Sequence, residues 1–224
     1  DWSSDVCSSD LMDTKQILTQ AGNHVAEALS KIDPAQVDAL AKAIAKANRV
    51  FVSGWGRAGN VAGILGMDMS QIGKVVFRVG DNNTPSIHEG DILLVVSGSG
   101  NTKTISIIAK EAKDFGATVG LISTSEQSII GEIADYNIVL PRIETPMAKI
   151  MKDKRPPRDP KFKGTAGTRE TYDLTAEERE AITLDQMELT YQTAFILNEV
   201  LQHKVMEELG ETFEAIHYYH NSLE

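Results

Sequence analysis

Residues 97–102, "SGSGNT", are the part of the chain best suited to bind a ligand, and they directly follow the apolar run "ILLVV". Serine and threonine hydroxyls donate and accept hydrogen bonds, and glycine lets the backbone approach a ligand closely. A helical pattern begins near Thr102, so the unpaired N–H groups of its first turn would face the same space. The run predicts an anion site in which Ser97, Ser99 and Thr102 bind a phosphate. A flexible turn with a threonine cap is the alternative.

The common nucleotide-binding motifs fit the sequence poorly. A Walker A loop needs a Gly-Lys-Ser/Thr sequence, and no lysine follows Gly100. The stretch "GWGRAG", with Gly54, Gly56 and Gly59, resembles the start of a dinucleotide-binding fingerprint. The acidic residue that should close the next strand falls instead in a polar loop at Asp81.

Five short apolar segments, mostly separated by helical patterns, would position these residues. They are "RVFVSG", "GKVVFRVG", "GDILLVVSG", "GATVGLIS" and "ADYNIVLP". Nearly continuous apolar strands between helices indicate a parallel sheet that is covered on both faces. We therefore predict an α/β three-layer sandwich of the flavodoxin- or Rossmann-like class, with a five-stranded parallel sheet flanked by helices. Ligands of such sheets bind beyond the carboxyl ends of the strands, where "SGWGRAGN" and "SGSGNT" lie.

Helical and loop patterns fill the rest of the chain. Helices are predicted over residues 12–32, from Pro34 to about Asn48, over residues 175–210, and from Glu211 onward; a break near Thr183 is the alternative for the third of these. Residues 142–174 are rich in Lys, Arg, Pro and Gly and predict a long loop. This basic loop is either a solvated surface segment or a lid over an anionic ligand.

Composition narrows the class of protein. The chain is 42% hydrophobic and 24% charged, which is typical of a globular domain. Its net charge of −10 disfavours nucleic acid and anionic membranes as partners. No apolar run approaches the roughly 20 residues of a membrane span, so we expect a cytoplasmic protein. The single cysteine, Cys7, lies in the first eleven residues, which argues against disulfides and thiolate metal sites.

Residues 1–11, "DWSSDVCSSDL", lack the basic start and apolar core of a signal peptide. They resemble the translation of a sequencing adapter, so we expect a non-native extension; a short disordered extension is the alternative. Residues 12–224 are then expected to form a single domain that contains the 142–174 loop.

Three motifs together resemble the sugar isomerase (SIS) domain family, and within it the 6-phospho-3-hexuloisomerases. They are "GWGRAGNVAG", "DNNTPSIHEGDILLVVSGSGNTKT" and the near-terminal His220. The resemblance is close over about residues 40–141 and looser in the last helices. It implies an SIS-type parallel sheet, a homodimer or homotetramer with sites at subunit interfaces, and binding of a phosphorylated sugar without metal or organic cofactor.

The resemblance also implies roles for single residues. Ser97, Ser99 and Thr102 would hold the phosphate with help from Ser53, Gly98 would contact the substrate, and Gly56 and Arg57 would line the sugar; an ion pair at the surface is the alternative for Arg57. The family moves a carbonyl along a sugar through an enediol intermediate, which needs a general base and an acid that opens the ring. His220 matches the histidine that has the second role; an exposed tail histidine is the alternative.

The sequence departs from the family where the general base is expected. Counting back from His220, the glutamate at the start of the penultimate helix is replaced by Tyr191, which we expect to contact the substrate. Glu188 lies about one helical turn earlier and is the first candidate for the base; Glu170 is the second.

The resulting hypothesis is an isomerase that converts a 3-hexulose 6-phosphate to fructose 6-phosphate. Its alternatives are an isomerase of another anionic sugar, such as a sulfonated one, and a non-catalytic protein that binds sugar phosphates.

Overall fold

The computed structural model describes residues 14–142, 175 and 189–220. The chain forms two compact units, one of residues 1–24 and 143–188 and the other of residues 25–142 and 189–224. Helix α1 (Thr14–Ser30) crosses from the first unit into the second. All strands that the structure describes belong to the second unit.

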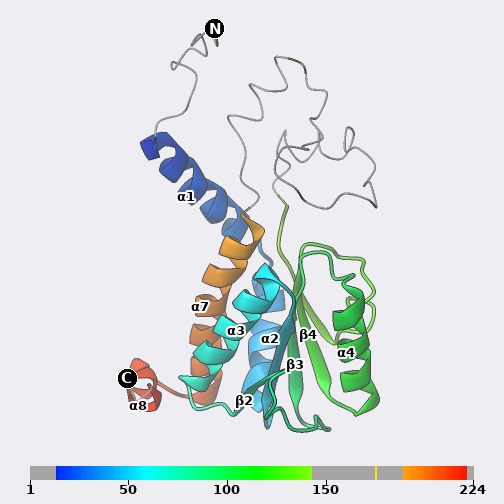
Figure 1. Cartoon of the computed structure of the whole chain (residues 1–224). Coiled ribbons are helices and arrows are strands. Elements are labelled where there is room, and N and C mark those ends of the chain that lie inside the picture. The colour runs from blue at the N-terminus through cyan, green and yellow to red at the C-terminus, as the bar shows by residue number, and fades with distance from the viewer. Residues whose placement is uncertain (1–13, 143–174, 176–188, 221–224) are drawn as a thin grey trace, which may run out of the picture. The chain divides into compact units, whose positions relative to one another are not determined.

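A five-stranded sheet forms the centre of the second unit, in the order β2-β1-β3-β4-β5 (Figure 1). All four pairings are parallel. The strands are β1 (Val50–Gly54), β2 (Val76–Arg78), β3 (Ile92–Val96), β4 (Thr118–Ser123) and β5 (Tyr136–Val139). The predicted five-stranded parallel sheet is confirmed, and each strand lies within its predicted segment.

Helices cover both faces of the sheet, as the prediction of a three-layer sandwich requires (Figure 1). One face is packed by α2 (Pro34–Lys46), α3 (Arg57–Ser70) and α7 (Thr190–Leu209), and the other by α4 (Lys103–Asp114). A short helix, α8 (Phe213–Tyr219), follows α7. Helix α2 begins at Pro34 as predicted, and Asp33 caps it, because its side chain accepts a hydrogen bond from the Ala35 N–H at 2.9 Å.

The central position of β3 in the sheet explains why its sequence is apolar without interruption. Ile92, Leu94 and Val96 belong to the core beneath α2, α3 and α7, whereas Leu93 and Val95 belong to the core beneath α4. All five side chains are buried. Because helices cover both faces of this central strand, none of its side chains meets solvent. Their burial holds the carboxyl end of β3 firmly in the sheet.

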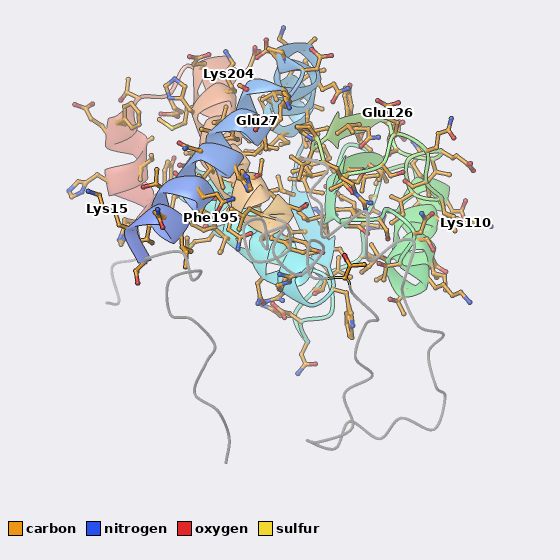
Figure 2. The ribbon with its side chains drawn as sticks, turned by 90° about the horizontal axis from the view of Figure 1, so that it is seen from above. Lys15, Glu27, Lys110, Glu126, Phe195 and Lys204 are labelled. Atoms are coloured by element: carbon orange, nitrogen blue, oxygen red, sulfur yellow. The ribbon has the colours of Figure 1, made fainter. Side chains whose placement is uncertain are left out.

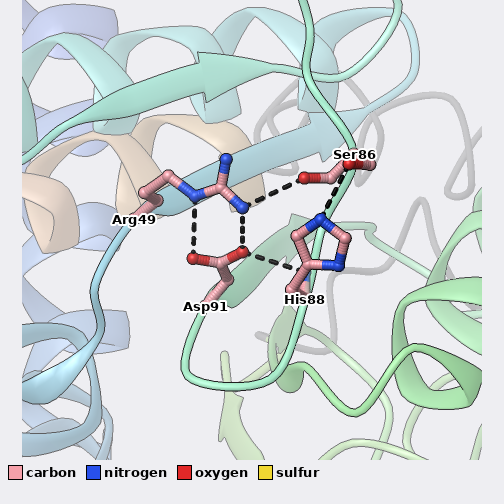
Figure 3. Close-up of polar contacts among 4 residues, drawn as sticks. All are labelled: Arg49, Ser86, His88 and Asp91. Carbon is pink, nitrogen blue, oxygen red and sulfur yellow. Dashed lines mark hydrogen bonds and ion pairs between the residues drawn. The ribbon is translucent and has the colours of Figure 1, made fainter.

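An ion pair anchors the opposite, amino edge of the sheet (Figure 3). Arg49 precedes β1, and its Nε–H donates to Asp91 Oδ1 at 3.0 Å, just before β3. The His88 backbone N–H donates to Asp91 Oδ2 at 2.9 Å, and Arg49 also donates to the Ser86 carbonyl at 3.0 Å. Burial raises the pKa of Asp91, but the hydrogen bonds from Arg49 and His88 outweigh it and keep that pKa below its usual value. The Thr-Pro-Ser segment is thereby tied to the edge of the sheet away from the glycine loops.

Several predictions fall outside the described residues. They concern the 1–11 extension, the basic loop beyond Arg142, most of residues 175–188, and the carboxylates Glu170 and Glu188. The final helices are described, and the long predicted one is observed over Thr190–Leu209.

Candidate functional site

The two glycine-containing loops leave the sheet side by side. Strands β1 and β3 are parallel neighbours, and Gly54 at the end of β1 pairs with Val96 at the end of β3. The loop from β1 to α3 and the loop from β3 to α4 therefore start from adjacent points at the carboxyl edge. This is the edge at which ligands bind in doubly wound sheets.

The β1–α3 loop is tight, and its glycines are needed for two different reasons. A Cβ at Gly54 would lie 2.9 Å from the backbone of Ala58, so only glycine allows this close approach. Gly56 precedes α3 with φ 60° and ψ −131°, a conformation that side chains with a Cβ rarely adopt. Arg57 is thereby placed as the first residue of α3, at the mouth of the loop.

The β3–α4 loop, residues 97–102, leaves the start of α4 open to a ligand. The Ser97 N–H donates to the Ile122 carbonyl at 3.0 Å, and the Gly100 N–H donates to the Ser97 carbonyl at 3.0 Å. Thr102 occupies the N-cap position of α4, but its side chain makes no capping hydrogen bond. The alternative interpretation, a flexible turn with a threonine cap, would require a hydrogen bond from a backbone N–H of α4 to the Thr102 hydroxyl, and this bond is not formed. Ser99 Oγ accepts from the Asn101 N–H at 3.2 Å.

Two buried serines lie beneath the loops. Ser53 is 5% exposed and Ser97 is 3% exposed. Within the described residues, Ser97 Oγ has no hydrogen-bond partner. A buried hydroxyl without a partner is unfavourable by about 1–3 kcal/mol, so Ser97 is a strong candidate to donate to a bound anion.

Residues 128–130 support the β3–α4 loop from the rear. The Ile130 N–H donates to the Gly100 carbonyl at 3.1 Å, and the Ile129 N–H donates to Asn101 Oδ1 at 2.9 Å. Gly100 has φ 62°, and a Cβ there would collide with the Ser128 hydroxyl. Glycine is therefore required at this position both by the positive φ and by the lack of space for a Cβ.

Thr124 and Arg142 form a second support that sequence reasoning missed. The Thr124 hydroxyl and backbone N–H both donate to the Gly98 carbonyl, at 2.7 and 2.9 Å. The Arg142 Nε–H donates to the Thr124 hydroxyl at 2.9 Å. These residues follow β4 and β5, so only the pairing of those strands with β3 brings them to the loop.

Tyr191 contacts residues of both glycine loops from the start of α7. The Arg57 guanidinium lies 4.7 Å from the centroid of the Tyr191 ring, within range of a cation–π interaction. The Tyr191 hydroxyl lies 3.1 Å from the position that a Cβ on Gly98 would occupy. The structure thus brings Arg57, Gly98 and Tyr191 together, as expected if all three contact one ligand.

His220 does not join this group within one chain. Helix α7 runs for 20 residues beyond Leu189, which carries the chain about 30 Å from the site before α8 begins. The Tyr219 ring lies 3.0 Å from the position of a Cβ on Gly73, beyond the far end of α3. His220 follows as an exposed residue at the end of α8. Figure 1 shows α8 at the opposite end of α7 from the start of that helix.

Among residues 14–142, 175 and 189–220, no group of three or more His, Cys, Asp and Glu side chains is placed to hold a metal ion. No helix in these segments is long and apolar enough to cross a membrane.

Comparison with known proteins relates this geometry to a family. The SIS domain model matches residues 43–152. A 3-hexulose-6-phosphate isomerase from Mycobacterium gastri is 39% identical over 124 residues, which cover 55% of this chain and 62% of that protein. A protein of the same name from Methanocaldococcus jannaschii is 30% identical over 155 residues, covering 69% of this chain and 80% of that protein. The match to the first of these thus spans about three fifths of its length.

Solved structures confirm the fold. The crystal structure of a hypothetical protein has a TM-score of 0.69 to this chain at 25% identity. The match covers 93% of this chain and 96% of that one.

Proposed function

Because the chain belongs to the SIS domain family, we propose that it is a sugar-phosphate isomerase that interconverts 3-hexulose 6-phosphate and fructose 6-phosphate. Relatives named for this activity support the substrate class. The observation that carries the proposal is the β3–α4 loop, where an unpartnered buried hydroxyl, Ser97, adjoins the uncapped start of α4. Hydroxyl donors beside the N–H groups of a helix start suit a phosphate.

In this proposal the phosphate binds to the hydroxyls of Ser97, Ser99 and Thr102 and to the first N–H groups of α4, with Ser53 beneath. The sugar extends over Gly56 toward Arg57 and Tyr191. A guanidinium at that position stabilises the negative charge that develops on the enediolate oxygens.

The reaction needs no net oxidant. A base removes the proton from C2 of the 3-hexulose, and the electron pair forms the C2–C3 double bond of an enediolate. Transfer of the O2 proton to O3, and return of the proton from the base to C3, leave the carbonyl at C2 and a hydroxyl at C3. We assign the base to Glu188, with Glu170 as the second candidate, and ring opening to His220. A phosphate ester does not cross membranes unaided, which supports a cytoplasmic reaction.

The position of His220 leads to a proposal about assembly. Since α7 and α8 carry His220 away from its own β3–α4 loop, it would act in the site of a second copy. A homodimer or homotetramer with sites at subunit interfaces satisfies this requirement.

Isotope exchange tests the proposed activity directly. The protein is incubated with fructose 6-phosphate in deuterated water, and exchange at the carbons beside the carbonyl is followed by NMR. We expect exchange by the wild type. The Ser99→Ala variant should bind the sugar about tenfold more weakly, because a hydrogen bond to a charged group is lost. Binding without exchange would instead identify a non-catalytic sugar-phosphate-binding protein, and unchanged affinity of Ser99→Ala would remove the loop from the site.

A further inference from the structure

Arg142 is a basic residue that the roles proposed above leave unused, although it is connected to the β3–α4 loop of residues 97–102, here called the anion loop. Its Nε–H donates to the Thr124 hydroxyl at 2.9 Å, and that hydroxyl donates to the Gly98 carbonyl at 2.7 Å. A guanidinium has five N–H groups, so four remain on its terminal nitrogens. Within the described residues, no ion pair of Arg142 with a carboxylate is observed.

The chain before Arg142 is well anchored at the carboxyl edge. The Leu140 N–H donates to the Ser123 carbonyl at 2.7 Å, and Leu140 is 2% exposed. Arg142 follows two residues later and is itself exposed. Its backbone is therefore held by the sheet, while its guanidinium is directed by Thr124.

Arg57 and Arg142 approach the anion loop from opposite sides. Arg57 follows β1 and Arg142 follows β5, and β3 lies between β1 and β4 in the strand order. Each arginine reaches Gly98 through one intermediary. Arg57 lies over the Tyr191 ring, whose hydroxyl adjoins Gly98, and Arg142 reaches the Gly98 carbonyl through Thr124.

We propose that Arg142 is a specificity-determining residue that binds the anionic group of the substrate and makes the site prefer a phosphate dianion to a sulfonate monoanion. The inference rests on the proposed function, since it assumes that the β3–α4 loop binds the anionic end of a sugar. It deepens that function by choosing between phosphorylated and sulfonated sugars.

The different charges of the two anions explain why a second guanidinium would favour a phosphate over a sulfonate. A phosphate monoester carries about −1.5 to −2 charges at pH 7, whereas a sulfonate carries one. The loop itself offers only neutral hydroxyls, N–H groups and the partial charge of a helix end, which both anions can use. A fixed cation interacts more strongly with the more highly charged anion, and it stands out in a chain of net charge −10.

Binding calorimetry with two matched ligands tests the proposal. The probes are fructose 6-phosphate and its 6-deoxy-6-sulfonate analogue, each titrated into the wild type and Arg142→Gln. We expect the variant to lose about tenfold in affinity for the phosphate and about threefold for the sulfonate. Lys110→Gln is the control, because it makes the same change in net charge at an exposed α4 residue that points away from the fold (Figure 2). It should change either affinity by less than about twofold.

The outcomes separate this inference from the function on which it rests. Unchanged affinities in Arg142→Gln, alongside weaker binding by Ser99→Ala, would overturn the role of Arg142 and keep the loop. Equal losses for both ligands would make Arg142 only a support for Thr124, and would also overturn the proposal. Since the readout is binding, an absence of isotope exchange would contradict the isomerase activity without touching Arg142. Failure of the wild type to bind either sugar would overturn both.

Discussion

Gly98 lies against the Tyr191 hydroxyl, and this single contact connects the β3–α4 loop to the residue that we propose to contact the sugar. A Cβ on Gly98 would lie 3.1 Å from that hydroxyl, which is closer than side chains normally pack. Its backbone does not have the positive φ of Gly56 or Gly100, so alanine is compatible with the local conformation. The reason for glycine here is therefore the space taken by Tyr191.

We predict that Gly98→Ala weakens binding of fructose 6-phosphate because Tyr191, and Arg57 above it, must move. Adding Tyr191→Phe should recover most of the lost affinity, since it removes the atom that the new methyl group meets. Calorimetric titration of the wild type, both single variants and the double variant gives the coupling between the two sites. Additive effects of the two substitutions would mean that the contact has no influence on the ligand.

In the proposed reaction Glu188 is the general base, and kinetics of its variants test that role. Glu188→Gln is expected to lower kcat by at least about 100-fold, the usual contribution of a positioned base, with little change in KM. Steady-state kinetics of Glu188→Gln and Glu170→Gln side by side would check this. Full activity of Glu188→Gln would contradict the assignment and leave Glu170 as the next candidate.

The sequence predicted the position of the loop, since the Ser-Gly run lies between β3 and α4 as expected, while its role as an anion site stays a prediction. A run of serines and glycines between a strand and a helix predicts an anion site without knowledge of any other element. Thr124 carries no such local signal, and Arg142 was indicated only as the first residue of the basic 142–174 loop. Their contacts with Gly98 depend on the pairing of β4 and β5 with β3, so the sequence alone did not indicate those contacts.

At the scale of elements, the packing of α7 on α3 buries a carboxylate that is not fully hydrogen-bonded. Asp68 of α3 is 3% exposed, and its Oδ2 has no hydrogen-bond partner within the described residues. The Gln202 side chain donates to the Asp68 carbonyl at 2.8 Å, and Asn198 donates to the Val61 carbonyl at 3.1 Å. Burial, and then the charge of Glu199, raise the pKa of Asp68 to about 6.

This raised pKa predicts that stability falls as pH rises. An unfolded aspartate has a pKa near 3.9, so between about pH 4 and 6 the folded state binds more protons than the unfolded state. The contribution of protonated Asp68 is complete below about pH 4 and is lost as pH passes 6, a change of roughly 2–3 kcal/mol. Urea unfolding of the wild type and Asp68→Asn from pH 4.5 to 7.5 measures it. The variant should show a flatter pH dependence, and Glu199→Gln an intermediate one; identical curves for all three would contradict the prediction.

Helix and strand positions were predictable because periodicity and end signals agreed. Asp33-Pro34 marks the start of α2, and alternate burial on two faces explains the apolar run of β3. The start of α7 was harder to predict, since the sequence shows one long helical pattern from 175 to 210. Its length, which separates Tyr191 from His220, becomes meaningful only when the direction of α7 relative to the sheet is known.

At the scale of the whole molecule, the separation of Tyr191 and His220 makes assembly the central question. Apolar side chains are exposed on the last two helices of the chain, including Phe195 at 42% (Figure 2), Val200 at 42% and Phe213 at 69%. A second copy of the chain could cover such side chains while bringing its His220 to the site.

Mixing two impaired variants distinguishes shared sites from separate ones. With fructose 6-phosphate well below saturation, Ser99→Ala lowers activity about tenfold through weaker binding and His220→Ala removes the proposed acid, so each homo-oligomer alone should have low activity. If sites are shared, a mixed dimer contains one site with both defects and one intact site. Random reassortment of equal amounts should then restore about a quarter of wild-type activity in the isotope-exchange assay. Restoration must require subunit exchange, so the mixture should gain activity only after dissociation and reassembly. No gain after confirmed exchange would place His220 outside the partner's site, because a site completed within one chain cannot be repaired by a second copy.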